Sequence, residues 1–302
     1  MKKEKTGARK RDRNRLDSIV LVILFGFLLM LLGQIAGMPI VNYADRIAES
    51  SPGLYTVLSY AYFIGIWVVV VGFMLLYRPD HELLRKLLPG GANTGRLFLI
   101  GLAAGFVTNA ICILVSVLHG DIHLYFAPSD ILMVLLCFPA VLIQSGAEEL
   151  LCRHYMQRHL ARRYKAPWVS VLLPSAVFAF LHIFNPGITR LSLANIAVIG
   201  LVYSLAVYYF DSFWMVAAMH AMWNYTQNII FGLPNSGLVM PLSIFKLDAA
   251  SAVDSFSYNV GFGVEGSVLA LLVNIALGAA IVILGRKKKA AQALTLEETE
   301  DI

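Results

Sequence analysis

Long apolar runs separated by short polar stretches dominate this chain of 302 residues. A helix that spans a bilayer needs about 20 largely apolar residues. The predicted spans, each with ends uncertain by a few residues, are 17–36, 55–77, 97–118, 131–150, 168–186, 192–210, 213–231 and 265–285. We therefore predict an all-α, polytopic membrane protein with about eight transmembrane helices.

A stretch without helix breakers follows the fourth predicted span. Residues 148–164 contain neither Gly nor Pro, and the next Pro is Pro167. Because Gly and Pro are the usual signals that end a helix, we expect this helix to continue past the membrane surface.

Basic residues are distributed unequally between the two sides of the predicted bundle. Eight Lys and Arg residues lie in the N-terminal tail, four in the second loop, five after the fourth span and four in the C-terminal tail. These 21 residues share one side, whereas only Arg46, Arg190 and Lys246 fall on the other. Since Lys and Arg accumulate in cytoplasmic segments, we predict a multi-pass cell-membrane protein with both termini in the cytoplasm.

The composition supports the membrane assignment and argues against other classes. The chain is 58% hydrophobic and 14% charged, whereas soluble domains are about 45–50% apolar and about 25% charged. The net charge of +5 does not indicate nucleic-acid binding, because the basic residues cluster beside apolar runs. The three cysteines lack CxxC spacing, which indicates neither a disulfide framework nor a thiolate zinc site. A nucleophilic role for Cys152 would require a nearby base.

Ionisable residues deep in a span are costly and therefore indicate function. The second, third and sixth predicted spans contain no Asp, Glu, Lys, Arg or His, and the first and last have charges only at their edges. The deep positions hold Glu148, Glu149, His182 and His220, which come from the fourth, fifth and seventh spans. If these three helices converge, the four side chains form one polar pocket.

The spacing of the two glutamates predicts different roles for them. Residues four apart share a helix face, so Arg153 can neutralise Glu149, while Glu148 points about 100° away. A carboxylate in a low-dielectric site can act as a general base at neutral pH. Glu148 is therefore the candidate that activates water, and Glu149 with Arg153 is a candidate structural ion pair.

Two further segments supply the other groups that peptide hydrolysis needs. His220 and Asn224 lie on one face of HAMWN and could stabilise a developing oxyanion. His182 closes FAFLH and could share the water on Glu148, either directly or by holding a metal ion.

These three motifs resemble those of a known family. EELLCR, from Glu148 to Arg153, is similar to EExxxR, FAFLH is similar to FxxxH, and HAMWN is similar to HxxxN/B, in the order found in the CPBP family. That family, whose name stands for CAAX protease and bacteriocin-processing, is also called Abi. The resemblance covers roughly residues 130–230 and implies an intramembrane protease fold of eight helices.

The resemblance also implies a chemistry and a site. Glu148 would activate water with His182, next to Glu149, and His220 with Asn224 would stabilise the oxyanion. The expected reaction is hydrolysis of a peptide bond in a membrane-associated protein or peptide within the lipid bilayer, as in CAAX processing or bacteriocin self-immunity. Zinc held by His182 and His220, as in a metalloprotease, and a metal-free glutamate mechanism both stay open. The motifs assign no substrate and no oligomeric state.

The predicted organisation follows from these segments. It comprises a basic cytoplasmic tail (1–16), N-terminal transmembrane helices (17–130), a catalytic core (131–231), an outer loop with the last transmembrane helix (232–289) and an acidic tail expected to be disordered (290–302).

Two other functions and two other histidine pairs are compatible with parts of the pattern. A catalytically silent scaffold or chaperone could use the same cavity, and a proton-coupled transporter could use its Glu and His residues as a relay. His119 and His123 form HxxxH, but Gly120 breaks the helix that would bring them together. His154 and His159 could likewise bind a metal near an Arg-rich surface.

Overall fold

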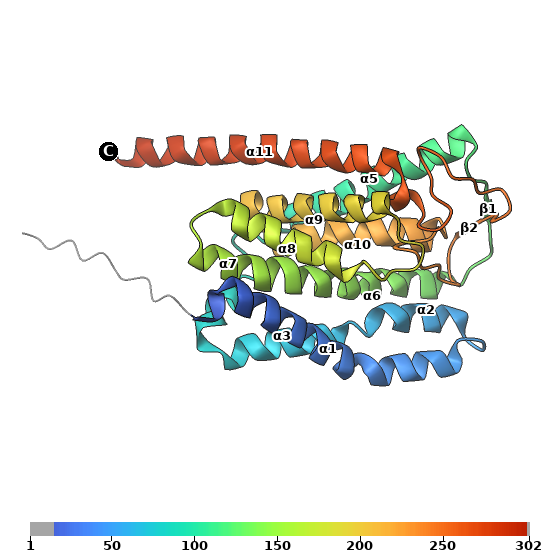
Figure 1. Cartoon of the computed structure of the whole chain (residues 1–302), viewed down its shortest axis with the longest axis horizontal. Helices are drawn as coiled ribbons and strands as arrows, with labels where there is room; N and C mark the ends of the chain where they lie inside the picture. Colours follow the sequence, from blue (N-terminus) through green and yellow to red (C-terminus); the bar gives the residue numbers. More distant parts are fainter. Residues whose placement is uncertain (1–14, 301–302) are drawn as a thin grey trace, which may run out of the picture.

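The computed structural model describes residues 15–300, so the predicted tail 1–16 falls almost entirely outside the described part, as do residues 301–302. Helices dominate it and run mostly along the long axis of the molecule (Figure 1). Their bounds are α1 Ile19–Ile47, α2 Pro52–Ala61, α3 Ile64–Leu76, α4 His81–Arg85, α5 Gly95–His119, α6 Ile131–Glu149, α7 Gln157–Arg163, α8 Pro167–Leu181, α9 Arg190–Phe210, α10 Phe213–Asn224 and α11 Val268–Glu300.

Shorter elements complete the fold. Two π-helical segments, η3 Leu150–Met156 and η4 Tyr225–Ile230, follow α6 and α10 directly. Three 3-10 turns are η1 Arg15–Asp17, η2 Arg78–Asp80 and η5 Val264–Gly266. Strands β1 Leu124–Phe126 and β2 Phe245–Leu247 pair antiparallel and lie at the end of the molecule opposite the end of α11 (Figure 1).

Within residues 15–300, six helical stretches are long and apolar enough to cross a membrane, which confirms the polytopic all-α prediction. They are 19–47, 52–76, 95–119, 131–163, 190–210 and 268–293. The two other predicted spans correspond to α8, which has only 15 residues, and to the helix 213–230, which carries a series of buried polar side chains. The count of eight therefore stays a prediction.

One helix ends where the sequence predicted, and two others extend further than predicted. The helix from Ile131 continues through η3 and α7 to Arg163, as the absence of Gly and Pro predicted. Helix α1 extends beyond the expected end at residue 36 and passes Pro39 to reach Ile47. Helix α11 continues to Glu300, through the tail expected to be disordered, because the residues after Gly285 include several Ala and no further Gly or Pro.

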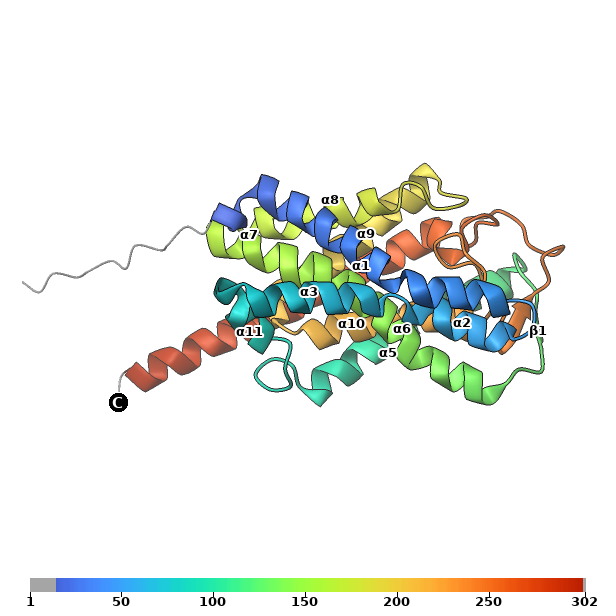
Figure 2. The same cartoon turned by 90° about the horizontal axis from the view of Figure 1, so that it is seen from below.

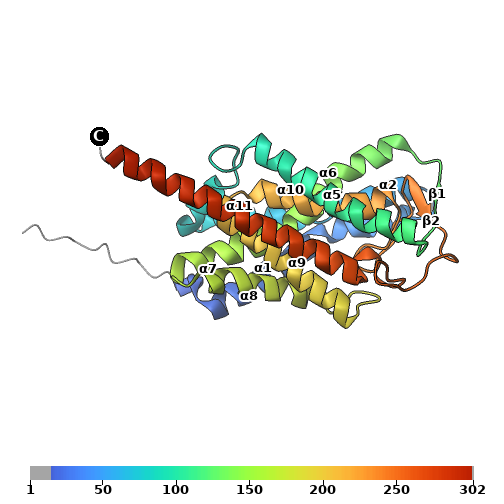
Figure 3. The same ribbon diagram turned by 90° about the horizontal axis from the view of Figure 1, so that it is seen from above.

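The helices form layers, with α10 inside the molecule. Helices α1, α2 and α3 form one outer layer, α6 to α10 form the middle, and α11 covers the opposite face (Figure 1). Viewed from below, α1 and α3 lie in front of α6 and α10 (Figure 2). Viewed from above, α11 lies over α9 (Figure 3).

Close approach of α5 to α10 depends on two glycines. A Cβ atom at Gly101 or Gly105 would collide with the backbone carbonyls of Met215 or Met219 on α10. This packing encloses α10 so completely that even its polar residues, including His220, are buried.

Candidate active site

A cavity of about 350 Å³ lies among α1, α2, α3, α6, α8, α10 and the segment 235–240. One part of its wall is apolar, with side chains such as Met30, Phe63 and Leu151. Other parts are polar. The polar lining residues include Gln144, Glu148, His182, Asn185, His220, Asn224, Asn235 and Ser236. Four of the residues proposed from the sequence thus share one cavity.

The two consecutive glutamates end α6 and diverge there. Glu148 lines the cavity with 22% of its side chain exposed, whereas the side chain of Glu149 is 0% exposed. Glu148 accepts a hydrogen bond from Gln144 Nε2 at 2.6 Å. The helix changes to π geometry at Leu150, immediately after both glutamates. Such π segments occur frequently at functional sites.

Glu149 and Arg153 form an ion pair inside the protein. Arg153 Nη1 donates to Glu149 Oε1 at 3.2 Å, and neither side chain is exposed. The guanidinium also donates to the carbonyl of Gly200 at 2.8 Å and lies 4.4 Å from the ring centroid of Phe178. The pair therefore lies inside the helix bundle, away from solvent.

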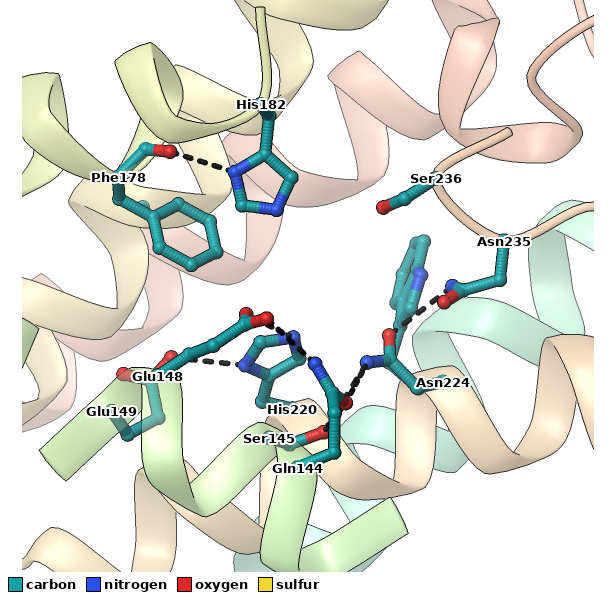
Figure 4. Close-up of polar contacts among 12 residues, drawn as sticks. Gln144, Ser145, Glu148, Glu149, Phe178, His182, His220, Asn224, Asn235 and Ser236 are labelled. Atoms are coloured by element: carbon teal, nitrogen blue, oxygen red, sulfur yellow. Dashed lines mark hydrogen bonds and ion pairs between the residues drawn. The ribbon is translucent and has the colours of Figure 1, made fainter. Parts of the chain in front are cut away.

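His220 connects the two glutamates. Its Nδ1 lies 2.9 Å from Glu149 Oε1, and its Nε2 lies 3.8 Å from Glu148 Oε2 (Figure 4). The ring of Tyr203 stacks on the imidazole at a centroid distance of 5.3 Å. The hydrogen bond and the stacking together fix the ring, so that Nε2 faces the cavity.

His182 lies across the cavity from Glu148 and His220, at the point where α8 ends (Figure 4). Its Nδ1 is 2.7 Å from the carbonyl oxygen of Phe178. Because a carbonyl only accepts hydrogen bonds, Nδ1 carries the proton, and in the neutral ring Nε2 keeps its lone pair.

Asn224 is held by a set of polar side chains. Its Nδ2 donates to Gln144 Oε1 and to Ser145 Oγ, both at 3.2 Å, and its Oδ1 accepts from Asn235 Nδ2 at 3.2 Å. These bonds are longer than the usual 2.9–3.0 Å, so the amide can exchange them for a bond to a substrate.

A metal centre is not assembled within residues 15–300, where no group of three or more His, Cys, Asp or Glu side chains is arranged to hold an ion. His119 pairs with Asp121, His154 contacts the carbonyl of Leu83, and His159 lies between the carboxylates of two aspartates, Asp17 and Asp80. Zinc on His182 and His220 stays a prediction.

A half-buried carboxylate that the sequence did not predict, Glu265, lies next to the site. Its position in the sequence is that of an edge charge of the last span, yet Glu265 Oε1 accepts from Trp223 Nε1 at 2.9 Å and from Asn235 Nδ2 at 3.1 Å. Trp223 is only 4% exposed. The available signal was an acidic residue directly before a long apolar run, with no basic residue near it in the sequence.

One family model matches the chain. Residues 130–226 match the family described as Type II CAAX prenyl endopeptidase Rce1-like. The matched segment contains Glu148, Glu149, His182, His220 and Asn224, which confirms the resemblance to CAAX proteases that the three motifs predicted. Asn235 and Glu265 lie outside it. No curated protein and no solved structure matches the chain.

Proposed function

We propose that this protein is an intramembrane endopeptidase that hydrolyses a peptide bond in a membrane-associated protein or peptide. The observation that carries the proposal is the meeting of Glu148, His182, His220 and Asn224 on one cavity in a bundle of membrane helices. The family matched by residues 130–226 is one of CAAX prenyl endopeptidases and supports the same reaction class.

Glu148 and His182 bind and activate the attacking water. The carboxylate of Glu148 and the Nε2 lone pair of His182 are both acceptors, so one water molecule in the cavity can donate a hydrogen to each. The water oxygen then keeps a lone pair for the substrate carbonyl. Glu148 takes a proton as the oxygen adds to the carbonyl carbon, and it later gives that proton to the leaving amine nitrogen as the C–N bond breaks.

His220 and Asn224 stabilise the oxyanion that forms during the attack. Asn224 supplies an amide N–H, and His220 supplies Nε2–H when the ring carries both protons, because Nδ1 already donates to Glu149. The carboxylates of Glu148 and Glu149 on either side of the ring balance that charge. Glu149 therefore acts through His220 as a positioning residue, and Arg153 pairs with Glu149 from the other side.

The membrane orientation is part of the proposal. The start of α1, the end of α7 and the end of α11 lie at one end of the molecule, and β1 and β2 lie at the other (Figure 1). The sequence segments rich in Lys and Arg adjoin the first end. We assign this end to the cytoplasmic side of the cell membrane. Impermeant thiol labelling of single cysteines placed at Arg163 and Ser129, in sealed vesicles, tests this assignment.

The central test replaces one oxygen of the catalytic carboxylate. Purified wild type and Glu148→Gln are compared in liposomes on a membrane-tethered peptide substrate. Loss of the general base is expected to lower kcat by about 10²–10⁴-fold. The matched control is Glu49→Gln, an exposed glutamate outside the cavity, which should cleave like the wild type. Equal rates for Glu148→Gln and the wild type would contradict the proposal.

A further inference from the structure

Glu265 lies in η5, outside the segment that matches the family model. Its carboxylate accepts hydrogen bonds from neutral donors. Trp223 and Asn235 donate to Oε1, and the backbone N–H of Ser236 donates to Oε2 at 2.6 Å. The hydroxyl of Ser236 lies 3.4 Å from the same oxygen. Two of these donors, the indole N–H and the backbone N–H, cannot accept a hydrogen bond, so the carboxylate must accept from them.

A chain of three side-chain amides connects this carboxylate to Glu148. Asn235 Nδ2 contacts both Glu265 Oε1 and Asn224 Oδ1, Asn224 Nδ2 contacts Gln144 Oε1, and Gln144 Nε2 contacts Glu148 Oε1. Figure 4 shows Asn235, Asn224 and Gln144 in succession along the polar wall of the site.

The acceptor at each end of the chain determines how every amide is turned. An ionised carboxylate accepts hydrogen bonds only, so Asn235 must turn its NH₂ group toward Glu265. The same NH₂ group faces Asn224, so the oxygen of Asn224 must accept from it. Asn224 therefore directs its own NH₂ group toward Gln144. Gln144 in turn presents its oxygen to Asn224 and its NH₂ group to Glu148. The requirements set by Glu265 and by Glu148 agree.

We propose that Glu265 is a positioning residue of the active site, which through Asn235 fixes the amide of Asn224 with its N–H donors toward the cavity. This inference rests on the proposed function, because the orientation matters only if Asn224 stabilises an oxyanion. Turned by 180°, Asn224 would present its oxygen to the developing negative charge and would oppose the reaction instead of assisting it.

Glu265→Gln tests the inference because it preserves size and removes the acceptor-only character. The backbone N–H of Ser236 makes the shortest bond to Glu265, so the oxygen of the new amide should face it and the NH₂ group should face Asn235. Asn235 must then turn over and face Asn224 with its oxygen, which conflicts with the orientation of Asn224 that Gln144 and Glu148 favour. We expect kcat to fall by about 100-fold, as when one oxyanion donor is removed, with KM little changed.

Two further variants separate positioning from general packing. Asn235→Ala interrupts the chain and should lower kcat in the same way. Trp223→Phe removes a donor from Glu265 but leaves the carboxylate and the three amides in place, so its kcat should remain close to that of the wild type. Unchanged kcat in both Glu265→Gln and Asn235→Ala, or an effect on KM alone, would overturn the inference.

A measurement without substrate distinguishes failure of this inference from failure of the proposed function. Equilibrium unfolding in detergent is compared for Glu265→Gln, Asn224→Ala and the double variant, each with and without Asn235→Ala. The inference predicts that the two effects on the unfolding midpoint are non-additive when Asn235 is present and additive when it is absent. Additive effects in both backgrounds would overturn it, whether or not the wild type cleaves peptides.

Discussion

Arg153→Met, which breaks the ion pair next to His220, is the substitution for which we expect the largest loss of stability. The structure buries both partners completely, and Glu149 Oε2 has no hydrogen-bond partner, so Arg153 and His220 alone compensate the carboxylate. Removing one partner of a buried pair leaves an uncompensated charge and costs about 3–5 kcal/mol. The variant also loses the bond to the carbonyl of Gly200 and the contact with Phe178, which places the expected loss in the upper part of that range.

The assay is equilibrium unfolding of the purified protein in detergent micelles. Glu149→Gln alone should also destabilise the protein, because it leaves the guanidinium of Arg153 buried without a counter-charge. The double variant contains neither charge, so it should be more stable than Arg153→Met alone by about 0.5–3 kcal/mol. A loss of unfolding free energy below about 1 kcal/mol for Arg153→Met would mean that the pair stabilises the protein no more than a solvent-exposed salt bridge does, which would refute the reasoning. Additive single effects would equally refute the reasoning.

Two other predictions concern acid stability and substrate choice. Burial alone would raise the pKa of Asp80, but hydrogen bonds and charge from His159 and Arg162 hold it below its usual range. A carboxyl whose pKa is lowered in the folded state stabilises the protein at pH values above its unfolded-state pKa of about 3.9. This stabilisation is lost as the pH falls through the folded-state pKa. The unfolding midpoint should therefore drop in that acid range, and it should drop less in Asp80→Asn. Among the described residues no Lys or Arg lines the cavity, and Glu148 would repel an anion, so peptides amidated at the C-terminus should be cleaved at least as fast as matched free acids. Faster cleavage of the free acids in a liposome assay would contradict this expectation.

Much of the fold follows from the sequence because apolar length is a strong signal in a membrane protein. The runs of apolar residues predicted the long helices, and the absence of Gly and Pro after residue 148 predicted the continuous helix to Arg163. The sequence did not predict the extent of α1 or α11, since nothing marks where a helix leaves the bilayer when its residues remain good helix formers.

The candidate site was partly predictable for the same reason. Glu148, His182 and His220 were found because ionisable groups deep in apolar spans are costly, and Asn224 because it shares a helix face with His220; all four line the cavity. Glu265 was missed because its position beside an apolar run is typical of a solvated edge. Its partial burial results from tertiary packing, in which the segment with Asn235 and Ser236 contacts its carboxylate, and no periodicity along the chain indicates such a contact.

The most direct test of the account is mass spectrometry of membrane-tethered peptides incubated with the purified protein in liposomes, with Glu148→Gln as the paired sample and metal analysis of both preparations. New peptide ends are expected at defined bonds with the wild type, and none with Glu148→Gln. If neither protein produces new ends while both still bind a membrane partner, the cavity serves a scaffold, and the catalytic roles given to Glu148, His182, His220 and Asn224 are wrong.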